Sequence, residues 1–173
     1  MNSFRKLALM AFWVIFSVSL NAQDLPKLKT APGIETGSFP NGIKYYLITN
    51  KAASGYADYA LVQKGVSDVQ KTRKELDSLD HLHGQKPYKF LSSRGVGYTH
   101  DGFAVHGDGF TMFKFQDVPV SDAASSDTTL MMLFDFCALY QGEQAVIISG
   151  DIDAASIKGK MSIFSMMVSP RHA

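Results

Sequence analysis

The amino-acid sequence predicts an α+β fold in which an antiparallel sheet is packed by helices. Two strand-like segments, residues 37–50 and 56–65, come first, and a third β segment follows at residues 98–119. Between and after them lie stretches with helical spacing, the longest at residues 121–142. The strands are therefore grouped and do not alternate strictly with helices. This order favours a sheet packed by helices over a doubly wound parallel sheet.

The first 22 residues are predicted to be a secretory signal peptide and not part of the fold. Arg5 and Lys6 form a basic start, and an apolar run follows at residues 7–20, close to the small residue Ala22. A membrane-spanning helix needs about 20 apolar residues, so this run is short for a span and fits the core of a signal peptide. We therefore predict export to the periplasm or the extracellular space, with an uncleaved anchor as the alternative.

Composition points to a globular domain with a nearly neutral charge balance. The chain has 17 basic and 16 acidic residues. This balance gives no reason to expect nucleic acid as a partner, or a membrane once the signal peptide is removed. The single cysteine, Cys137, cannot form an internal disulfide, so the domain must rely on its core. We place a flexible lead at residues 23–36 and a single domain at 37–173, either shortened or the first part of a longer chain.

A hairpin and two strands are predicted at the start of the domain. The segment 37–50 contains a Pro-Asn-Gly turn, after which Ile43, Tyr45 and Leu47 alternate with residues of the opposite face. Alternation with a period of two is typical of a strand that buries one face. Residues 56–65 alternate less regularly but indicate a second strand, closed by a glycine.

Two helices are predicted after these strands. Residues 68–84 are rich in charge, carry Leu76 and Leu79 three positions apart, and end at Gly84. This pattern predicts a helix with a solvated outer face. Pro87 predicts the start of a short second helix, because proline is favoured in the first turn.

Residues 98–119 form the clearest β segment of the sequence. Phe103 and Val105 alternate with other residues, a Gly-Asp-Gly turn follows, and Phe113 and Phe115 continue the pattern beyond it. The segment therefore predicts two strands joined by a tight turn.

The last part of the chain predicts a buried helix, a central strand and a final helix. Within residues 121–142 a helical spacing of 3.6 relates the apolar residues Leu130, Leu133, Phe134, Cys137 and Ala138. Such an apolar helix is expected to be largely buried. We interpret Cys137 as a residue of the core and not as a nucleophile. The apolar run 144–149 predicts a central strand. Residues 150–168 then predict a helix that is capped by Asp153.

Residues 75–82, ELDSLDHL, raise the question of a metal site. Asp77, Asp80 and His81 stand at positions i, i+3 and i+4, so a helix would bring their side chains to one face. Two carboxylates and an imidazole on one face fit a metal site, the remains of one, or an ordinary solvated surface. The residues alone leave these three interpretations open.

Other candidate metal ligands do not follow the spacing of a known metal motif. Together with His81 they are His83, His100, Asp101, His106 and Asp108. His81 and His83 are two positions apart and cannot share a helix face, and the two further aspartates resemble turn residues. We interpret these additional side chains as surface polar groups.

Four segments occur in an order that is found in a known peptidase family. They are FPNGIKYYL, YADYALVQKG, DSLDHL and AVIISGDID, within residues 36–168. In this order they resemble the N-terminal domain of the pitrilysin/insulinase (inverzincin) family of zinc metallopeptidases. The resemblance implies an antiparallel sheet packed by helices, which agrees with the order of elements above.

The zinc motif of that family, H-x-x-E-H, is degenerate in this chain. In the family two histidines bind zinc and the glutamate activates a zinc-bound water. By the resemblance Asp77 and His81 correspond to the two histidines, as vestigial metal ligands, and Asp80 corresponds to the catalytic glutamate. Aspartate is one methylene shorter than glutamate, and a misplacement of about 1 Å can cost about 100-fold in rate.

The third zinc ligand of the family, a glutamate on a later helix, has no evident counterpart. The acidic residues after position 135 are Glu143, Asp151 and Asp153. They are expected at a turn, a strand end and a helix cap. The chain passes from Tyr140 to the strand at 144–149 in a few residues, so we expect the helical segment that carries the third ligand to be missing.

These departures predict an exported, non-catalytic domain that serves as a structural or partner-binding lobe of a two-lobed metallopeptidase assembly. The partner would be an active pitrilysin-like lobe, from another chain or from sequence beyond residue 173, and a peptide is a further candidate ligand. No cofactor is expected. The alternative is a residual zinc-dependent metalloendopeptidase in which Asp77 and His81 bind zinc and Asp80 is the general base. A third interpretation is an exported domain unrelated to peptidases.

Overall fold

The computed structural model describes the part of the chain that carries the sheet and its helices. The described residues are 32–65, 68, 70, 71, 74, 78, 86–97 and 104–169. All of them belong to one unit of the chain, Ala31–Ala173. The predicted signal peptide, residues 1–22, lies outside the described residues.

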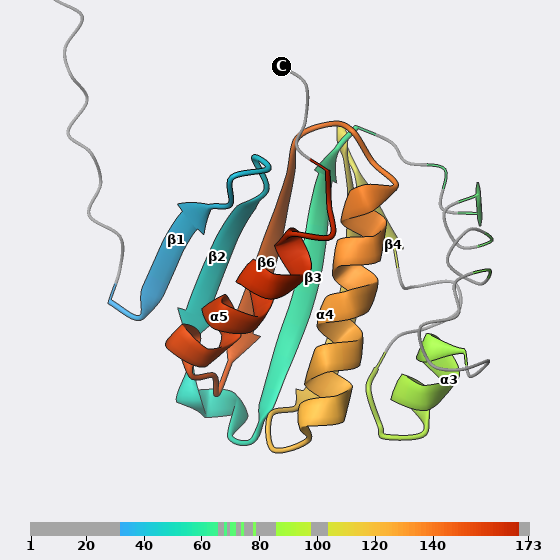
Figure 1. The fold of residues 1–173 in the computed structure, drawn as a ribbon. Helices are drawn as coiled ribbons and strands as arrows, with labels where there is room; N and C mark the ends of the chain where they lie inside the picture. The colour runs from blue at the N-terminus through green and yellow to red at the C-terminus, as the bar shows by residue number, and fades with distance from the viewer. Residues whose placement is uncertain are drawn as a thin grey trace, which may run out of the picture. The chain divides into compact units, whose positions relative to one another are not determined.

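In the described part of the chain, six strands form one sheet in the order β1-β2-β6-β3-β5-β4 (Figure 1). Their bounds are β1 Ile34–Ser38, β2 Lys44–Thr49, β3 Tyr56–Lys64, β4 Ala104–Gly107, β5 Phe110–Pro119 and β6 Gln144–Gly150. Neighbouring strands are antiparallel except β2 and β6, which are parallel. Because β2 and β3 run in opposite directions, a strand inserted between them must be parallel to one of the two. The predicted α+β class is confirmed, and β6 is the predicted central strand.

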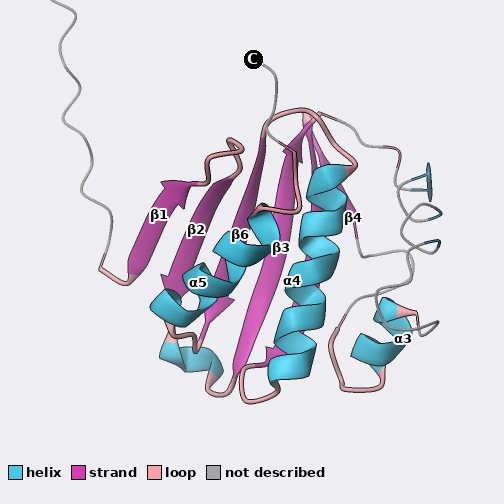
Figure 2. Cartoon of the chain, viewed as in Figure 1, coloured by secondary structure: helices cyan, strands magenta, loops and turns pink. Residues whose placement is uncertain are grey.

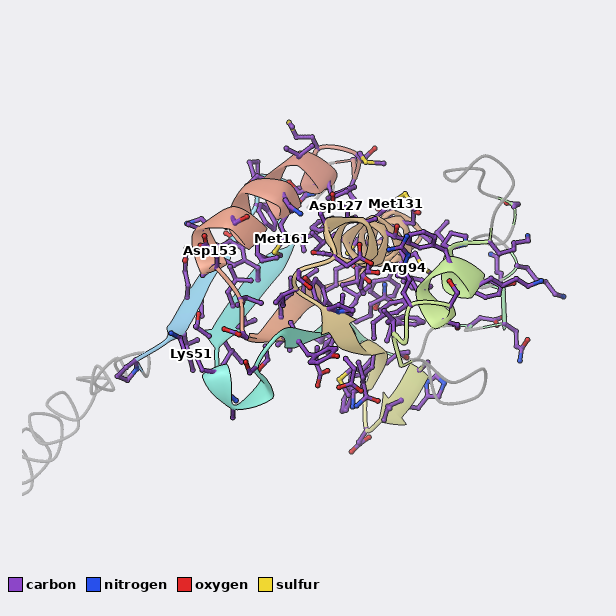
Figure 3. The ribbon with its side chains drawn as sticks, turned by 90° about the horizontal axis from the view of Figure 1, so that it is seen from below. Lys51, Arg94, Asp127, Met131, Asp153 and Met161 are labelled. Atoms are coloured by element: carbon purple, nitrogen blue, oxygen red, sulfur yellow. The ribbon has the colours of Figure 1, made fainter. Side chains whose placement is uncertain are left out.

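Among the described residues, two helices cover one face of the sheet (Figure 2). Helix α4, Ala123–Ala138, packs against β3 and β5, and helix α5, Ala154–Ser165, packs against β2. The end-on view of Figure 3 shows both helices on the same side of the strands, where Met161 of α5 is fully buried. The short helix α3, Pro87–Ser92, contacts α4, and a 3₁₀ turn, η1, spans Lys51–Ala53.

The hydrophobic core lies between these helices and the face of the sheet that they cover. Alternate strand residues point into it, among them Leu47, Leu61, Phe113, Phe115, Val146 and Ile148, all fully buried. The ring of Phe113 stacks on that of Phe136 in α4, with centroids 4.5 Å apart. The predicted stripe of α4 is buried at Leu130, Leu133, Phe134 and Cys137. Its fifth member, Ala138, is exposed because the helix ends at that residue.

The sheet begins earlier than the sequence predicts. The predicted flexible lead of residues 23–36 is wrong at its end, because β1 starts at Ile34 and pairs with β2, Ile34 opposite Ile48. β1 is an edge strand whose residues are at most half-buried. Its place in the sheet depends on backbone hydrogen bonds with β2, which leave little trace in the hydrophobic pattern.

The remaining predicted elements fall partly outside the described residues. The helix predicted at 68–84 is described only at Gln70, Lys71, Lys74 and Ser78, which are helical and exposed. The short helix predicted from Pro87 is confirmed as α3. In the segment 98–119, β4 and β5 are joined by the predicted Gly-Asp-Gly turn, whereas residues 98–103 lie outside the described part.

The turn between β1 and β2 is fastened to the C-terminal end of α5 by Asn41. The side-chain amide of Asn41 donates to the carbonyl of Ser165 at 2.9 Å, and its Oδ1 accepts from the amide of Ile43 at 3.1 Å. The following residue, Gly42, has a φ of +82°, a conformation that favours glycine. The Asn-Gly pair of the sequence therefore joins two segments that are 124 positions apart.

Replacement of Asn41 with alanine is expected to lower the free energy of unfolding by about 1–3 kcal/mol, because buried backbone groups lose their hydrogen-bond partners. Urea denaturation followed by circular dichroism measures this loss. The matched control is Asn50→Ala, which removes an exposed hydrogen bond that the Asn50 Oδ1 accepts from the amide of Ala52. The control should cost clearly less, and equal losses in the two variants would contradict the role of Asn41.

Helix α4 begins at a cap formed by Asp122. The carboxylate accepts from the amide of Ala124 at 3.1 Å and from the Ser125 hydroxyl at 2.7 Å, and it forms an ion pair with Arg94. The Ser125 hydroxyl, and after it the Arg94 guanidinium, hold the pKa of Asp122 below its ordinary value of 3.8. The ionised carboxylate is thus the form that the folded protein favours.

The stability that Asp122 contributes is expected to depend on pH. A carboxyl whose pKa is lowered by folding takes up its proton first in the unfolded chain, so acid favours unfolding. The advantage of the wild type over Asp122→Asn should be present above about pH 4 and be lost as the pH falls through the lowered pKa. Urea midpoints of both proteins at neutral and acid pH measure it, and an advantage that grows toward acid would contradict the cap.

Candidate functional site

The residues that the sequence predicts for a metal site are not among the described residues. Asp77, Asp80 and His81 lie outside them, and so do the further candidates His83, His100 and Asp101. Within the described ranges, no three His, Cys, Asp or Glu side chains lie close enough together to hold a metal ion. His106 and Asp108 are exposed at the end of β4 and in the turn after it, and Nδ1 of His106 lies 3.3 Å from the Thr111 hydroxyl. Both side chains are thus polar groups at the surface of the described part.

The Gly-Asp pair at the end of β6 has a structural role. Gly150 has a φ of +153°, and a Cβ at this position would lie 2.5 Å from Cα of Ala57 in β3. The carboxylate of Asp151 accepts from the amide of Gly55 at 3.1 Å, and the amide of Asp151 donates to the carbonyl of Tyr56 at 3.0 Å. The pair therefore holds the end of β6 against the start of β3.

The other acidic residues late in the chain also take part in the fold. Asp153 caps α5 by accepting from two amides of its first turn, as predicted, and Glu143 pairs with Lys64 at 3.1 Å. α4 ends at Ala138 and β6 begins at Gln144. In the continuously described range 104–169 no helix lies between them. The described connection thus lacks the helical segment on which the family's third zinc ligand is expected.

A small polar pocket lies near the beginnings of α4 and α5. It has a volume of about 110 Å³, and its lining includes Tyr59, Ser126, Asp151, Ile157 and Lys160. The hydroxyls of Tyr59 and Ser126 share a hydrogen bond of 2.9 Å, and Lys160 pairs with Asp127 at 2.6 Å (Asp127 is labelled in Figure 3). Burial raises the pKa of Tyr59. Because Tyr59 keeps its proton and Lys160 is paired, neither is placed to activate Ser126 as a base.

The face of the sheet opposite α4 and α5 forms a trough. Strand residues alternate between the two faces, so this face carries the positions between the core residues. The two central strands, β6 and β3, present the smaller side chains Ala145, Ile147, Ser149, Ala60 and Val62 over the middle of this face, and β3 adds Tyr56 and Asp58 at one end and Lys64 at the other. The flanking strands, β2 and β5, present the longer side chains Lys44, Tyr46, Ile48, Phe110, Met112 and Lys114. Over its middle the trough therefore has a lower floor between two higher walls.

One end of the trough is hollowed into a groove. The groove has a volume of about 260 Å³ and is lined by Lys44, Tyr46, Val62, Lys64, Gly109, Phe110, Glu143, Gln144 and Ala145. Aromatic rings form opposite sides of it, and the charged groups of Lys44, Lys64 and Glu143 stand beside them. The arrangement suits an apolar side chain next to a charged or polar one, which is typical of a protein or peptide contact.

This face was not identified as a candidate site from the sequence, because alternation shows which strand residues are in the core and not what the residues between them contact. A signal was present in residues 144–149, where Ala145 and Ile147 are apolar as well as the core residues Val146 and Ile148. A continuous apolar run is typical of a strand that is covered on both faces. In the described part of the chain, α4 and α5 cover one of them.

No protein-family profile and no curated protein matches the chain. Its described fold is that of the M16 peptidase and insulinase-family domains. The first half of the periplasmic protease PqqL from Escherichia coli aligns with a TM-score of 0.65 and 11% identity, over 82% of this chain and 47% of that chain. A predicted insulinase family protease from Yersinia pestis aligns with a TM-score of 0.57 and 13% identity, over 82% and 48%. A peptidase M16 inactive domain from Pseudomonas fluorescens aligns with a TM-score of 0.56 and 9% identity, over 81% and 52%.

These structures confirm the resemblance to the pitrilysin/insulinase family at the level of the fold. With identities of 13% or less, the likeness concerns the arrangement of strands and helices and not the residues of a site. The chain spans about half the length of these three structures.

Proposed function

We propose that the chain is an exported, non-catalytic domain of the pitrilysin/insulinase type that serves as a structural or partner-binding lobe of a two-lobed metallopeptidase assembly. The observation that carries this proposal is the sequence DSLDH at residues 77–81. By the resemblance, this stretch stands at the position in the order of segments where active members of the family have H-x-x-E-H. The segments before it form the turn that precedes β2, β2 itself and β3, and the segment after it forms β6 and the N-cap of α5. The M16 fold therefore supports reading the stretch as the degenerate motif.

The chemistry of zinc favours inactivity. A catalytic zinc needs three protein ligands and an open position for water. By the resemblance Asp77 and His81 would supply two ligands, one of them through a carboxylate shorter in reach than an imidazole. The connection between α4 and β6 has no helix to supply a third, and Asp80 is retracted by one methylene relative to glutamate. A site built in this way is expected to bind zinc weakly and to place the water-activating group poorly.

A paired role is supported by the size of the chain and by the nature of its structural neighbours. The PqqL structure is described as the first half of a protease, and the Pseudomonas fluorescens structure as an inactive domain. We propose that an active pitrilysin-like lobe, in another chain or in sequence beyond residue 173, completes the assembly. A peptide is a further ligand that such an assembly would enclose.

Export is supported by the basic start and short apolar run of residues 1–22. The structural neighbour PqqL is described as periplasmic. Among the described residues, no helix has both the length and the apolar character needed to cross a membrane. We propose that the mature chain begins near residue 23 and works in the periplasm or outside the cell.

Co-purification tests the pairing. A C-terminally tagged chain, recovered from the periplasmic or secreted fraction at native expression, is expected to bring down a zinc peptidase with an intact H-x-x-E-H in near-equimolar amount. Mass spectrometry of the same sample should find an N-terminus near residue 23. If the tagged chain is recovered without a peptidase partner, the result would count against a partner-binding lobe.

The residual metalloendopeptidase is the second candidate, because His81 and an acidic residue at position 80 are retained. In this reading Asp77 and His81 hold zinc and Asp80 is the general base. Peptide cleavage by the zinc-loaded chain, compared with cleavage by Asp80→Ala, decides it. Zinc-dependent cleavage that falls by about 100-fold or more in the variant would support a peptidase. Cleavage that is absent, or unchanged in Asp80→Ala, removes this candidate.

A further inference from the structure

We propose that the open face of the sheet binds a single amphipathic helix of a partner protein, with acidic residues on both flanks of the apolar stripe of that helix. This proposal rests on the proposed function as a partner-binding lobe, and it names the surface and the chemistry of the contact. Three features of the trough carry it, namely its shape, its apolar floor and the lysines on its walls.

The shape of the trough fits one helix. Neighbouring strands lie about 4.8 Å apart, so β2 and β5, which are separated by β6 and β3, stand about 14 Å apart. A helix with its side chains is about 10–12 Å across and can lie between these two walls. The floor runs along β6, Gln144–Gly150, or about 23 Å, which is the length of a helix of about 15 residues.

The middle of the floor is mainly apolar, and the backbone of its strands is already paired. Ala60 and Val62 lie beside Ile147 and Ala145 in the β3–β6 register, and Tyr46 on the β2 wall remains 39% exposed. β6 and β3 are interior strands, so their amides and carbonyls are used by the sheet ladder. A partner therefore cannot add a strand here and must be recognised through side chains, as a helix with an apolar stripe would be.

The walls of the trough select for negative charge. Lys44 stands on the β2 wall and Lys114 on the β5 wall, and no described carboxylate forms an ion pair with either. Of the described acidic groups of this face, Glu143 pairs with Lys64, whereas Asp58 accepts from a backbone amide of β5 at 3.0 Å and lies toward the Tyr56 end of the floor. A helix in the trough would thus meet a lysine on each side, which favours glutamate or aspartate on both flanks of its stripe.

Two model helices test the proposal on the purified chain. Both are capped, fluorescein-labelled peptides of about 15 residues with the same leucine stripe, and their flanks carry either glutamates or lysines. Fluorescence anisotropy at low salt is expected to show that the glutamate helix binds about tenfold more tightly, because two exposed ion pairs replace two repulsions. Added salt should reduce this preference. Equal affinities, or no binding of the glutamate helix, would overturn the proposal.

Variants of the trough locate the binding. Ala145→Trp fills the floor and is expected to weaken binding of the glutamate helix by about tenfold or more. The matched control is Ala155→Trp on the exposed side of α5, which should bind as the wild type does. The double variant Lys44→Glu with Lys114→Glu leaves the floor intact and should reverse the preference in favour of the lysine helix. Circular dichroism confirms that each variant is folded.

Two results would overturn the choice of occupant even if the peptide binds. One is unchanged binding by a folded Ala145→Trp variant, which would place the contact elsewhere. The other is sedimentation equilibrium showing that the chain pairs with itself in the wild type but not in Ala145→Trp, which would make a second copy the occupant. None of these readouts involves zinc or peptide cleavage, so failure of the docking proposal is distinguishable from failure of the proposed function.

Discussion

Gly150→Ala is expected to lower the free energy of unfolding by about 3–5 kcal/mol. The φ of +153° at this position strains any residue with a Cβ, and the added methyl group would collide with the carbonyl of Tyr56 and with Cα of Ala57. Both obstacles are backbone atoms of β3, so neither can rotate away as a side chain can. Relief would require separating the ends of β6 and β3, which the Asp151 hydrogen bonds hold together.

The control for this prediction is Gly159→Ala. Gly159 lies inside α5, and a Cβ there meets no atom within 4 Å. Alanine at this position should stabilise the helix by about 0.5–1 kcal/mol, because glycine loses more backbone freedom on folding. Urea denaturation of the two variants therefore gives shifts of opposite sign. A Gly150→Ala protein as stable as the wild type would show that the ends of β6 and β3 are not packed as described.

Phe113→Ala is expected to cost about 3–5 kcal/mol through the cavity that it leaves in the core. The ring is fully buried and stacks on that of Phe136, so its loss removes contacts between the sheet and α4. The cavity cannot be refilled easily, since the neighbouring Phe115 and Leu61 are themselves fully buried. The loss is measured as a shift of the urea midpoint with an unchanged dependence on denaturant.

Phe110→Ala provides the matched control in the same strand. Phe110 is the same residue type in β5, but it lies on the open face and is only half-buried. Its truncation should cost less than half as much as that of Phe113. If the two variants lost equal stability, the assignment of the core to the α4 and α5 side of the sheet would be wrong.

Local patterns in the sequence were sufficient to predict most of the elements. The alternation of Ile43, Tyr45 and Leu47 predicted β2 and its buried face, because one covered face leaves a period of two. The helical spacing in α4 likewise predicted its buried stripe, and Asp153 predicted the start of α5. These features depend on neighbours within a few residues, which the sequence displays directly.

Long-range features could not be predicted in the same way. The sequence does not display the insertion of β6 between β2 and β3, nor the hydrogen bond that joins Asn41 to Ser165. β1 is held in the sheet by backbone hydrogen bonds with β2. The trough exists only once β2, β6, β3 and β5 lie side by side, because it is formed by the faces of these strands that point away from the core. For the metal site, the degenerate motif at residues 77–81 stays a prediction, because those residues lie outside the described part of the chain.

Zinc titration at neutral pH tests the central claim, that this pitrilysin-like domain is non-catalytic, most directly. The purified chain is dialysed free of metal and titrated with zinc in a calorimeter, beside its His81→Ala variant. We predict no saturable site tighter than about 1 μM in the wild type, and the same titration curve for both proteins. One zinc ion bound per chain at nanomolar affinity, and lost in His81→Ala, would contradict the account.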